Sequence, residues 1–191
     1  MKSLTFVTPN GWKHEEARRL LSSIDVHWSR EGLPSPRGLS LEDTARARAA
    51  AAYEALGVPV FVENTELAVA TEEHGLRDGI RGGAAKRLLE ALGEPELTAR
   101  YGGLAADTRV VVALATGPRP RDVMTFEGEI SGTIAEAPRG DHGYGWDRIF
   151  VPEGYTRTLA ELASSKFLVN MREKPYLDLA DHVLGRAFGG S

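Results

Sequence analysis

The chain has 191 residues, which is the size of one domain and long enough to bury a single core. Hydrophobic residues make up 42% of it and charged residues 26%, so wholesale disorder is excluded. Its formal charge of −4 argues against a general nucleic-acid binder, because a phosphate backbone requires a basic face. The absence of cysteine excludes disulfides, thiolate catalysis and cysteine zinc sites. The apolar runs are too short for a signal peptide or a membrane span, so we expect a cytoplasmic protein without membrane contact.

Apolar runs of strand length alternate with helical spacings along the chain. The sequence predicts strands over residues 4–8, 26–29, 58–62, 108–116 and 124–136. It predicts helices over residues 12–23, 40–56, 82–92, 159–163 and 176–188. Asn10 suits the N-cap of the first helix, and Gly57 and Gly93 suit the ends of the second and third. This alternation predicts an α/β fold built on a mixed sheet.

The segment Thr8–Lys13 joins the first strand to the first helix and is the first candidate site. A helix start presents unpaired backbone N–H groups and the positive end of the helix dipole, which together favour an anion. Lys13 lies in the first turn, where its ammonium group could contact a phosphate. The alternative is a plain N-cap followed by a solvated lysine, which is the commoner arrangement when these residues are taken alone.

Four carboxylates, Glu42, Asp43, Glu63 and Glu66, form the second candidate site. Glu63 follows an apolar strand, at the edge where open α/β sheets usually bind ligands. Phosphate chemistry commonly uses Mg²⁺, held by one or two carboxylates and by the substrate's own oxygens. The alternative for Glu42 and Asp43 is a pair of helix-start charges, and that for Glu63 is a solvated strand end.

The glycine-rich segment 140–147 is the third candidate site. Its glycines let the backbone approach a flat ligand, and Tyr144 and Trp146 offer rings that could stack on a base. Asp147 could accept hydrogen bonds from a purine or from nearby backbone. The alternative is a glycine turn whose aromatic side chains only cover the core.

Lys166 and Arg172 lie near a predicted helix entry and form the fourth candidate site. Two cations there could bracket a phosphate or a base carbonyl, and the alternative is ordinary surface charge. The five histidines show no metal-ligand spacing, so no histidine metal site is expected.

Taken in chain order, these segments resemble the inosine triphosphate pyrophosphatase family, whose members hydrolyse aberrant purine nucleoside triphosphates. The resemblance covers residues 4–172 and rests on the order and spacing of six motifs. In the family these are Thr-Gly-Asn-x-x-Lys, a helix with an acid and a lysine, two acids ending a strand, Gly-Phe-Gly-Tyr-Asp, Thr-Phe-Ala-Glu-Met, and a lysine before Ser-His-Arg. The matching segments here are Thr8–Lys13, Asp43 with Arg48, Glu63–Leu67, Gly143–Asp147, Thr158–Leu162, and Lys166 with Asn170–Arg172.

The resemblance implies a two-lobed mixed sheet flanked by helices, with a nucleotide cleft between the lobes and one domain over residues 1–191. It also implies a homodimer that binds a purine nucleotide and uses Mg²⁺. The implied substrate-binding residues are Thr8, Asn10, Lys13, Tyr144, Gly145, Trp146, Asp147, Lys166 and Arg172. The implied metal ligands are Asp43 and Glu63, and the implied catalytic positions are Lys13, Glu63 and Asn64.

The chain departs from the family at the end of the third strand. Asn64 replaces the second acid, which in the family binds the metal or activates water. An amide cannot accept a proton at neutral pH, and losing a positioned base costs on the order of 10²- to 10⁴-fold in rate. Asn170 and Met171 likewise replace the Ser-His of the family. Two alternatives therefore stay open: a protein that binds nucleotide with little hydrolysis, or a hydrolase of a different specialised nucleotide.

Glu66 offers a local replacement for the lost acid. In an extended segment residues two apart face the same side, so Glu66 would share the side of Asn64. We therefore expect Glu66, aided by Glu63, to act in catalysis. The alternative is that Glu66 is an exposed loop acid.

Overall fold

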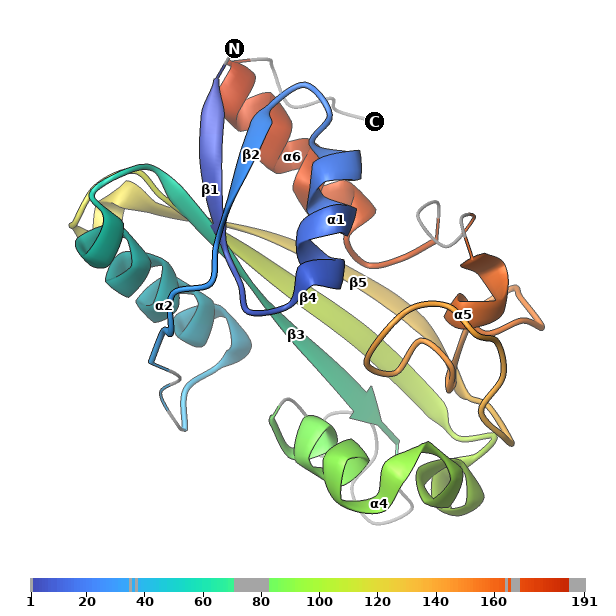
Figure 1. Cartoon of the computed structure of the whole chain (residues 1–191). Coiled ribbons are helices and arrows are strands. Elements are labelled where there is room, and N and C mark those ends of the chain that lie inside the picture. The colour runs from blue at the N-terminus through green and yellow to red at the C-terminus, as the bar shows by residue number, and fades with distance from the viewer. Residues whose placement is uncertain are drawn as a thin grey trace. The chain divides into compact units, whose positions relative to one another are not determined.

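A computed structural model describes residues 2–34, 36, 38–70, 83–163, 165 and 169–185, with side chains omitted for 83–88. The strands of this part of the chain are β1 (Ser3–Val7), β2 (Asp25–Ser29), β3 (Val60–Val69), β4 (Ala105–Ala115), β5 (Val123–Ile134) and β6 (Phe150–Pro152) (Figure 1). The helices are α1 (Gly11–Leu20), α2 (Leu41–Leu56), α4 (Gly83–Tyr101), α5 (Leu159–Leu162) and α6 (Glu173–Leu184), with a 3₁₀ turn, η1, at Pro120–Asp122. None of the described helices is both long enough and apolar enough to cross a membrane.

The strands form one six-stranded sheet in the order β2-β1-β3-β4-β5-β6. β1 runs parallel to β2 and β3, whereas β6 runs antiparallel to β5. The predicted fold class, a mixed α/β sheet flanked by helices, is therefore confirmed. The nucleotide cleft and the single domain over residues 1–191 stay predictions.

The chain divides into two compact units, which are described separately below. Unit 1 comprises Met1–Asn64, Val110–Gly128 and Glu173–Ser191, and unit 2 comprises Thr65–Arg109 and Glu129–Arg172.

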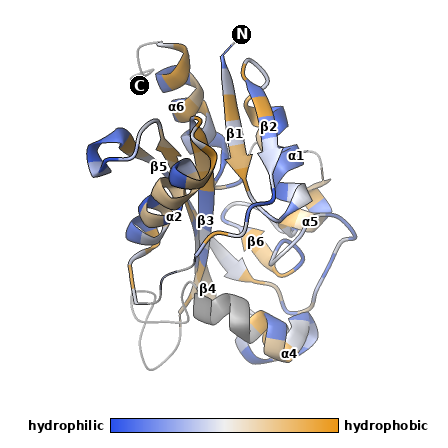
Figure 2. Cartoon of the chain, turned by 60° about the vertical axis from the view of Figure 1, so that its left-hand side comes forward, coloured by the Kyte–Doolittle hydropathy of each residue, from blue (hydrophilic) through white to orange (hydrophobic). Residues whose placement is uncertain are grey.

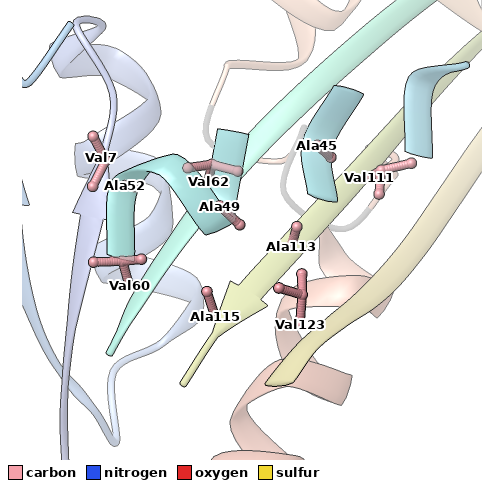
Figure 3. Packing of buried hydrophobic residues seen from close by; sticks show 10 residues of the cluster. All are labelled: Val7, Ala45, Ala49, Ala52, Val60, Val62, Val111, Ala113, Ala115 and Val123. Atoms are coloured by element: carbon pink, nitrogen blue, oxygen red, sulfur yellow. The ribbon is translucent and has the colours of Figure 1, made fainter. Parts of the chain in front are cut away.

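The core of unit 1 lies between α2 and the sheet. Ala45, Ala49 and Ala52 recur along one face of α2 and are fully buried. They pack against strand residues whose side chains are small or β-branched, namely Val7, Val60, Val62, Val111, Ala113, Ala115 and Val123 (Figure 3). Alanine lets the helix approach the sheet closely, so a larger residue at these positions would cost about 1–3 kcal/mol in overpacking.

The opposite face of the unit 1 strands carries aromatic side chains. Because side chains alternate along β3, Phe61 and Glu63 point away from the face on which Val60 and Val62 pack. Phe61 stacks on Phe6 with ring centroids 4.5 Å apart. Tyr176 of α6 meets Phe61 edge-on at 6.1 Å. Helices α1 and α6, which contact each other, therefore provide the partners on this face of β3.

Unit 2 has its own core. Its buried apolar residues come from β3, α4, β4, β5, β6 and α5, and they are Leu67, Val69, Leu97, Ala106, Ile134, Ile149, Phe150, Leu159 and Leu162. A capping box begins α5: the Thr158 hydroxyl accepts from Glu161 N, and the Glu161 carboxylate accepts from Thr158 N. This reciprocal pair fixes the start of a helix that has only four residues.

One predicted element end was wrong. β3 does not stop at the polar cluster Glu63–Glu66 but continues to Val69, which Figure 2 shows as a hydrophilic stretch inside the strand. The strand tolerates these polar residues because Glu63 and Asn64 find partners far away in the sequence. The predicted helix end at Gly93 is confirmed: Gly93 is non-helical, with φ 76° and ψ 166°, and the rest of α4 is a second helical segment that reaches Tyr101.

Candidate functional site

The turn between β1 and α1 is built by two side chains. Asn10 is the N-cap of α1, and its Oδ1 accepts from the backbone N–H groups of Trp12 at 2.9 Å and Lys13 at 3.4 Å. Thr8, which is buried, accepts from Asn10 N through its hydroxyl at 3.2 Å. The predicted cap is therefore confirmed, and it points the start of α1 along a fixed direction.

Lys13 does not point into solvent, as the plain-cap interpretation expected. Its Nζ lies 2.9 Å from Glu63 Oε1, and the side chains are 17% and 0% exposed. The phenol of Tyr176 donates to the other carboxylate oxygen, Oε2, at 2.8 Å. The first turn of α1, the middle of β3 and the first turn of α6 thus meet at one buried carboxylate. A buried carboxylate with these donors is costly to leave unpaired, so the three residues depend on one another.

Asn64 points to the other face of β3, where α2 packs. The guanidinium of Arg48 in α2 donates to Asn64 Oδ1, while the buried Nε of Arg48 has no hydrogen-bond partner. Burial lowers the pKa of Arg48 from its ordinary value, and the nearby Glu63 carboxylate raises it in part. A guanidinium stays protonated through such shifts, so a permanent positive charge faces a neutral amide here.

The acids at the start of α2 have local partners. Asp43 is exposed, and its Oδ2 accepts from the Ser40 hydroxyl at 2.7 Å while Ser40 Oγ accepts from Asp43 N. Glu42 accepts from Arg46 at 2.8 Å and from Thr125 of β5 at 3.0 Å. These hydrogen bonds hold the pKa of Glu42 below its ordinary value. Both acids thus make local contacts at the start of α2, and metal binding by Asp43 stays a prediction.

Among the described residues, the candidate ligand oxygens of Glu63 and Asn64 are already held by donors. Both oxygens of Glu63 accept from donors, and Asn64 Oδ1 accepts from Arg48. In the described part of the chain, no three histidine or acidic side chains gather in a way that could hold a metal. Mg²⁺ prefers oxygen ligands in a near-octahedral set. The Glu63 carboxylate has two cations nearby, Lys13 and Arg48, and is therefore a poor ligand for such an ion.

The glycine-rich loop of unit 2 is closed by its own aspartate. Asp147 is buried, and its Oδ2 accepts from Tyr144 N at 3.0 Å. Gly143 has φ 96°, and a Cβ there would lie 2.2 Å from Asp147 Oδ2, so only glycine fits. Trp146 packs partly against the unit 2 core, whereas Gly145 is exposed. Asp147 thus has the backbone role that the sequence left open, and Trp146 in part covers the core.

Arg172 is brought to the same loop. It is 5% exposed, and its guanidinium carbon lies 5.4 Å from the centre of the Tyr144 ring. Its backbone N–H donates to Asn170 Oδ1 at 2.7 Å. Arg172 is therefore not the surface charge of the alternative interpretation, whereas its predicted partner Lys166 lies outside the described residues.

The remaining predicted residue, Glu66, lies in β3 and is 8% exposed. It is therefore not the exposed loop acid of the alternative interpretation. Sequence reasoning missed Tyr176, which was expected only to begin a helix. A helical tyrosine carries no local signal for a partner 113 positions away, so only the fold shows it.

Comparison with known proteins supports the resemblance seen in the sequence. A sequence model described as the Ham1 family matches residues 4–181. The chain is 34% identical to the inosine triphosphate pyrophosphatase of Yarrowia lipolytica, with 84% of each chain covered. It is 35% identical to the dITP/XTP pyrophosphatase of Methanopyrus kandleri, with 82% of each covered. Among solved structures, a HAM1 protein from Coxiella burnetii matches with a TM-score of 0.71 at 22% identity, covering 97% of this chain and 100% of that one.

Proposed function

The chain belongs to the Ham1 family, and on that premise we propose that it hydrolyses a purine nucleoside triphosphate to a nucleoside monophosphate and pyrophosphate. Relatives that cover most of the chain are named inosine triphosphate pyrophosphatase and dITP/XTP pyrophosphatase. Those names favour a purine other than adenine or guanine as the base.

The contact between Lys13 and Glu63 carries this proposal. It joins a cation from the helix-start turn to a carboxylate on the neighbouring strand, 2.9 Å apart and largely buried. A turn that presents a helix N-terminus and an ammonium group suits a phosphate chain. A carboxylate at the same place suits a water molecule that must lose a proton.

The proposed reaction uses Lys13 as an exchangeable partner. An incoming phosphate competes with Glu63 for the ammonium group of Lys13, while Thr8 and Asn10 keep the turn in place. The Glu63 oxygen that Lys13 leaves can then accept a proton from water. The oxygen of that water bonds to the α-phosphorus, the bond from this phosphorus to the bridging oxygen breaks, and pyrophosphate leaves with the bond's electron pair.

The loop of unit 2 is proposed to bind the base. Tyr144 and Trp146 offer ring faces, Gly145 is exposed backbone, and Arg172 offers donors over the Tyr144 ring. Asp147 holds the loop backbone from within. Lys166 keeps the role that the resemblance implies, which is to contact base or phosphate.

Magnesium is proposed to arrive with the nucleotide. Nucleoside triphosphates supply phosphate oxygens to Mg²⁺, which then needs few ligands from the protein. This proposal differs from a metal site preformed by Asp43 and Glu63, because both carboxylates already have partners. Asp43 accepts a hydrogen bond from Ser40, and Glu63 pairs with Lys13 and accepts a hydrogen bond from Tyr176. The homodimer implied by the resemblance and the cytoplasmic location expected from the short apolar runs belong to the same proposal, and light scattering measures the first.

A second candidate function is nucleotide binding with little hydrolysis. The observation that favours it is the pair of Arg48 and Asn64, in which an amide stands beside a buried cation. That amide cannot take a proton from water, so catalysis depends on the remaining acids. Tight binding would survive this change, whereas turnover would fall by about 10²-fold or more.

Product analysis with a panel of triphosphates tests the proposal. We expect one pyrophosphate per monophosphate from inosine, deoxyinosine or xanthosine triphosphate, and much less from ATP or GTP. Lys13→Met should abolish turnover and weaken binding, whereas Lys174→Met, an exposed lysine paired with Asp178, should not. Nucleotide binding without product would favour the second candidate. The absence of both binding and product would refute both candidates.

A further inference from the structure

Trp28 of β2 contacts the turn that begins α1. In the parallel register of β1 and β2, Trp28 pairs with Phe6 and Ser29 with Val7. The indole Nε1 of Trp28 donates to the carbonyl oxygen of Thr8 at 2.8 Å. The N–H of Thr8 donates to the carbonyl oxygen of Ser29 at 3.0 Å. Both backbone polar groups of Thr8 are therefore held by consecutive residues of β2.

The indole ring is fixed by charged and aromatic neighbours. The His14 ring of α1 stacks on it with centroids 4.8 Å apart and planes 11° apart. The guanidinium carbon of Arg30 lies 4.2 Å from the Trp28 ring centre. A cation over an indole is the most favourable cation–π pairing in proteins, and stacking adds to it. Although Trp28 is 36% exposed, its ring is thus restrained by both its neighbours.

Gly11 completes the contact from the side of the turn. A Cβ at position 11 would lie 3.2 Å from Trp28 Cη2 and 3.7 Å from Cζ2. The first of these distances is tighter than ordinary contact, so an alanine there would have to push the indole or the turn. The absence of a side chain at residue 11 and the size of the indole at residue 28 therefore fit each other.

We propose that Trp28 is a positioning residue for the phosphate-binding turn. Through its bond to Thr8 it sets the Thr8 hydroxyl, which accepts from Asn10 N. Asn10 in turn caps the N–H groups of Trp12 and Lys13. A side chain that touches no substrate thus determines where the first turn of α1 presents its donors. This inference rests on the proposed function, which assigns the turn to the phosphate chain.

The substitution Trp28→Phe separates positioning from simple packing. Phenylalanine keeps a ring for His14 and Arg30 but removes the N–H that donates to Thr8. The loss of one such bond should weaken binding of inorganic tripolyphosphate by about 3- to 10-fold in a calorimetric titration. With nucleotide as substrate, KM should rise by a similar factor while kcat changes little, because ground-state and transition-state binding are lost together.

The matched control lies next to it on the same strand. His27→Gln alters an exposed side chain that pairs with Asp25, so it disturbs β2 without touching Thr8. It should leave tripolyphosphate affinity and KM unchanged. If Trp28 were only a packing residue, Trp28→Phe would lower the melting temperature and leave both binding quantities as in the parent protein.

A double-mutant cycle with Gly11 gives a second readout. Gly11→Ala should weaken tripolyphosphate binding in the parent, because the new Cβ meets the outer indole ring. It should weaken binding less in the Trp28→Phe protein, since phenylalanine lacks the Cη2 and Cζ2 atoms. The inference would be overturned if the two substitutions had strictly additive effects on affinity, or if Trp28→Phe bound tripolyphosphate as the parent does. The proposed function would still hold in either case, provided that the parent turns over nucleotide. A parent protein that neither binds tripolyphosphate nor turns over any nucleoside triphosphate would overturn both the inference and the proposed function.

Discussion

The most consequential single residue is Asn64, because it places an amide where the resemblance implies a carboxylate that binds the metal or activates water. Its Oδ1 accepts from the guanidinium of Arg48, which is partly buried and whose Nε has no hydrogen-bond partner. The nearby carboxylate, Glu63, already accepts from Lys13 and Tyr176. The oxygens of Glu63 and Asn64 are therefore already held by donors on both faces of β3, which makes them poor ligands for a free metal ion.

We predict that Asn64→Asp raises turnover by about tenfold or more. A carboxylate there would pair with Arg48 and could accept a proton from water, whereas the amide cannot. The measurement is steady-state pyrophosphate release, with Ser23→Asp, which adds a carboxylate at an exposed turn, as the control. If turnover stays at the parent level, the missing base is not what limits this protein.

Glu66 is the second residue whose role can be decided directly. It is buried in β3, two positions after Asn64, so a catalytic role remains the expectation drawn from the sequence. Glu66→Gln keeps the size of the side chain and removes the charge, and we predict a loss of pyrophosphate release of about 10²-fold. Glu153→Gln, an exposed acid, is the control. Activity equal to the parent would rule out this role for Glu66.

At the scale of elements, the helix ends that depend on neighbouring residues were predicted correctly, whereas the end of β3, which depends on long-range contacts, was not. Asn10 and Ser40 cap their helices, and Gly57 ends α2 in the left-handed conformation, because such hydrogen bonds involve neighbours in sequence. The end of β3 was mispredicted because polar residues usually mark a strand end. Glu63 contacts Lys13 and Tyr176, and Asn64 accepts from Arg48, and no local pattern connects these partners to the strand.

In the candidate site, too, the residues with local sequence signals were predicted and those placed by long-range contacts were not. The turn residues and the glycine loop were found from local chemistry, and the family resemblance brought them into one reaction scheme. The resemblance did not point to Tyr176 or Trp28, since neither belongs to a quoted motif. Their roles depend on one hydrogen bond each, to Glu63 and to Thr8, and those follow only from the packing of α6 and β2.

The link between α2 and β5 gives a prediction about pH. Arg46 and Thr125 hold the pKa of Glu42 below its ordinary value, so the contact stabilises the fold above that value. The stabilisation is lost as the pH falls through the lowered pKa. Glu42→Gln should therefore lower the free energy of unfolding at neutral pH, by about 0.5 kcal/mol given its exposure, and leave it unchanged in acid. Urea denaturation at both pH values measures this, and an equal loss in acid would contradict it.

At the scale of the whole molecule, the distribution of charge bears on the proposal that Mg²⁺ arrives with the nucleotide. The chain carries a formal charge of −4, yet the carboxylate next to the phosphate turn has two cations nearby, Lys13 and Arg48. A free divalent cation would have to displace or repel them. A phosphate chain that already carries Mg²⁺ would instead place phosphate oxygens next to the ammonium group of Lys13. It would also supply most of the ligands of the ion.

We therefore predict that Mg²⁺ binds this protein tightly only together with a polyphosphate. Calorimetric titration of Mg²⁺ into the protein alone should give weak binding. The same titration with inorganic tripolyphosphate present should give binding at least about tenfold tighter, after the binding of Mg²⁺ to tripolyphosphate in buffer is subtracted. Lys13→Met should reduce this difference, because it removes the cation that holds the phosphate. Asp43→Asn should leave the titrations unchanged, since the carboxylate of Asp43 is bonded to Ser40. Tight binding of Mg²⁺ to the protein alone, lost in Asp43→Asn, would instead show that the ion is held by the carboxylates of the chain.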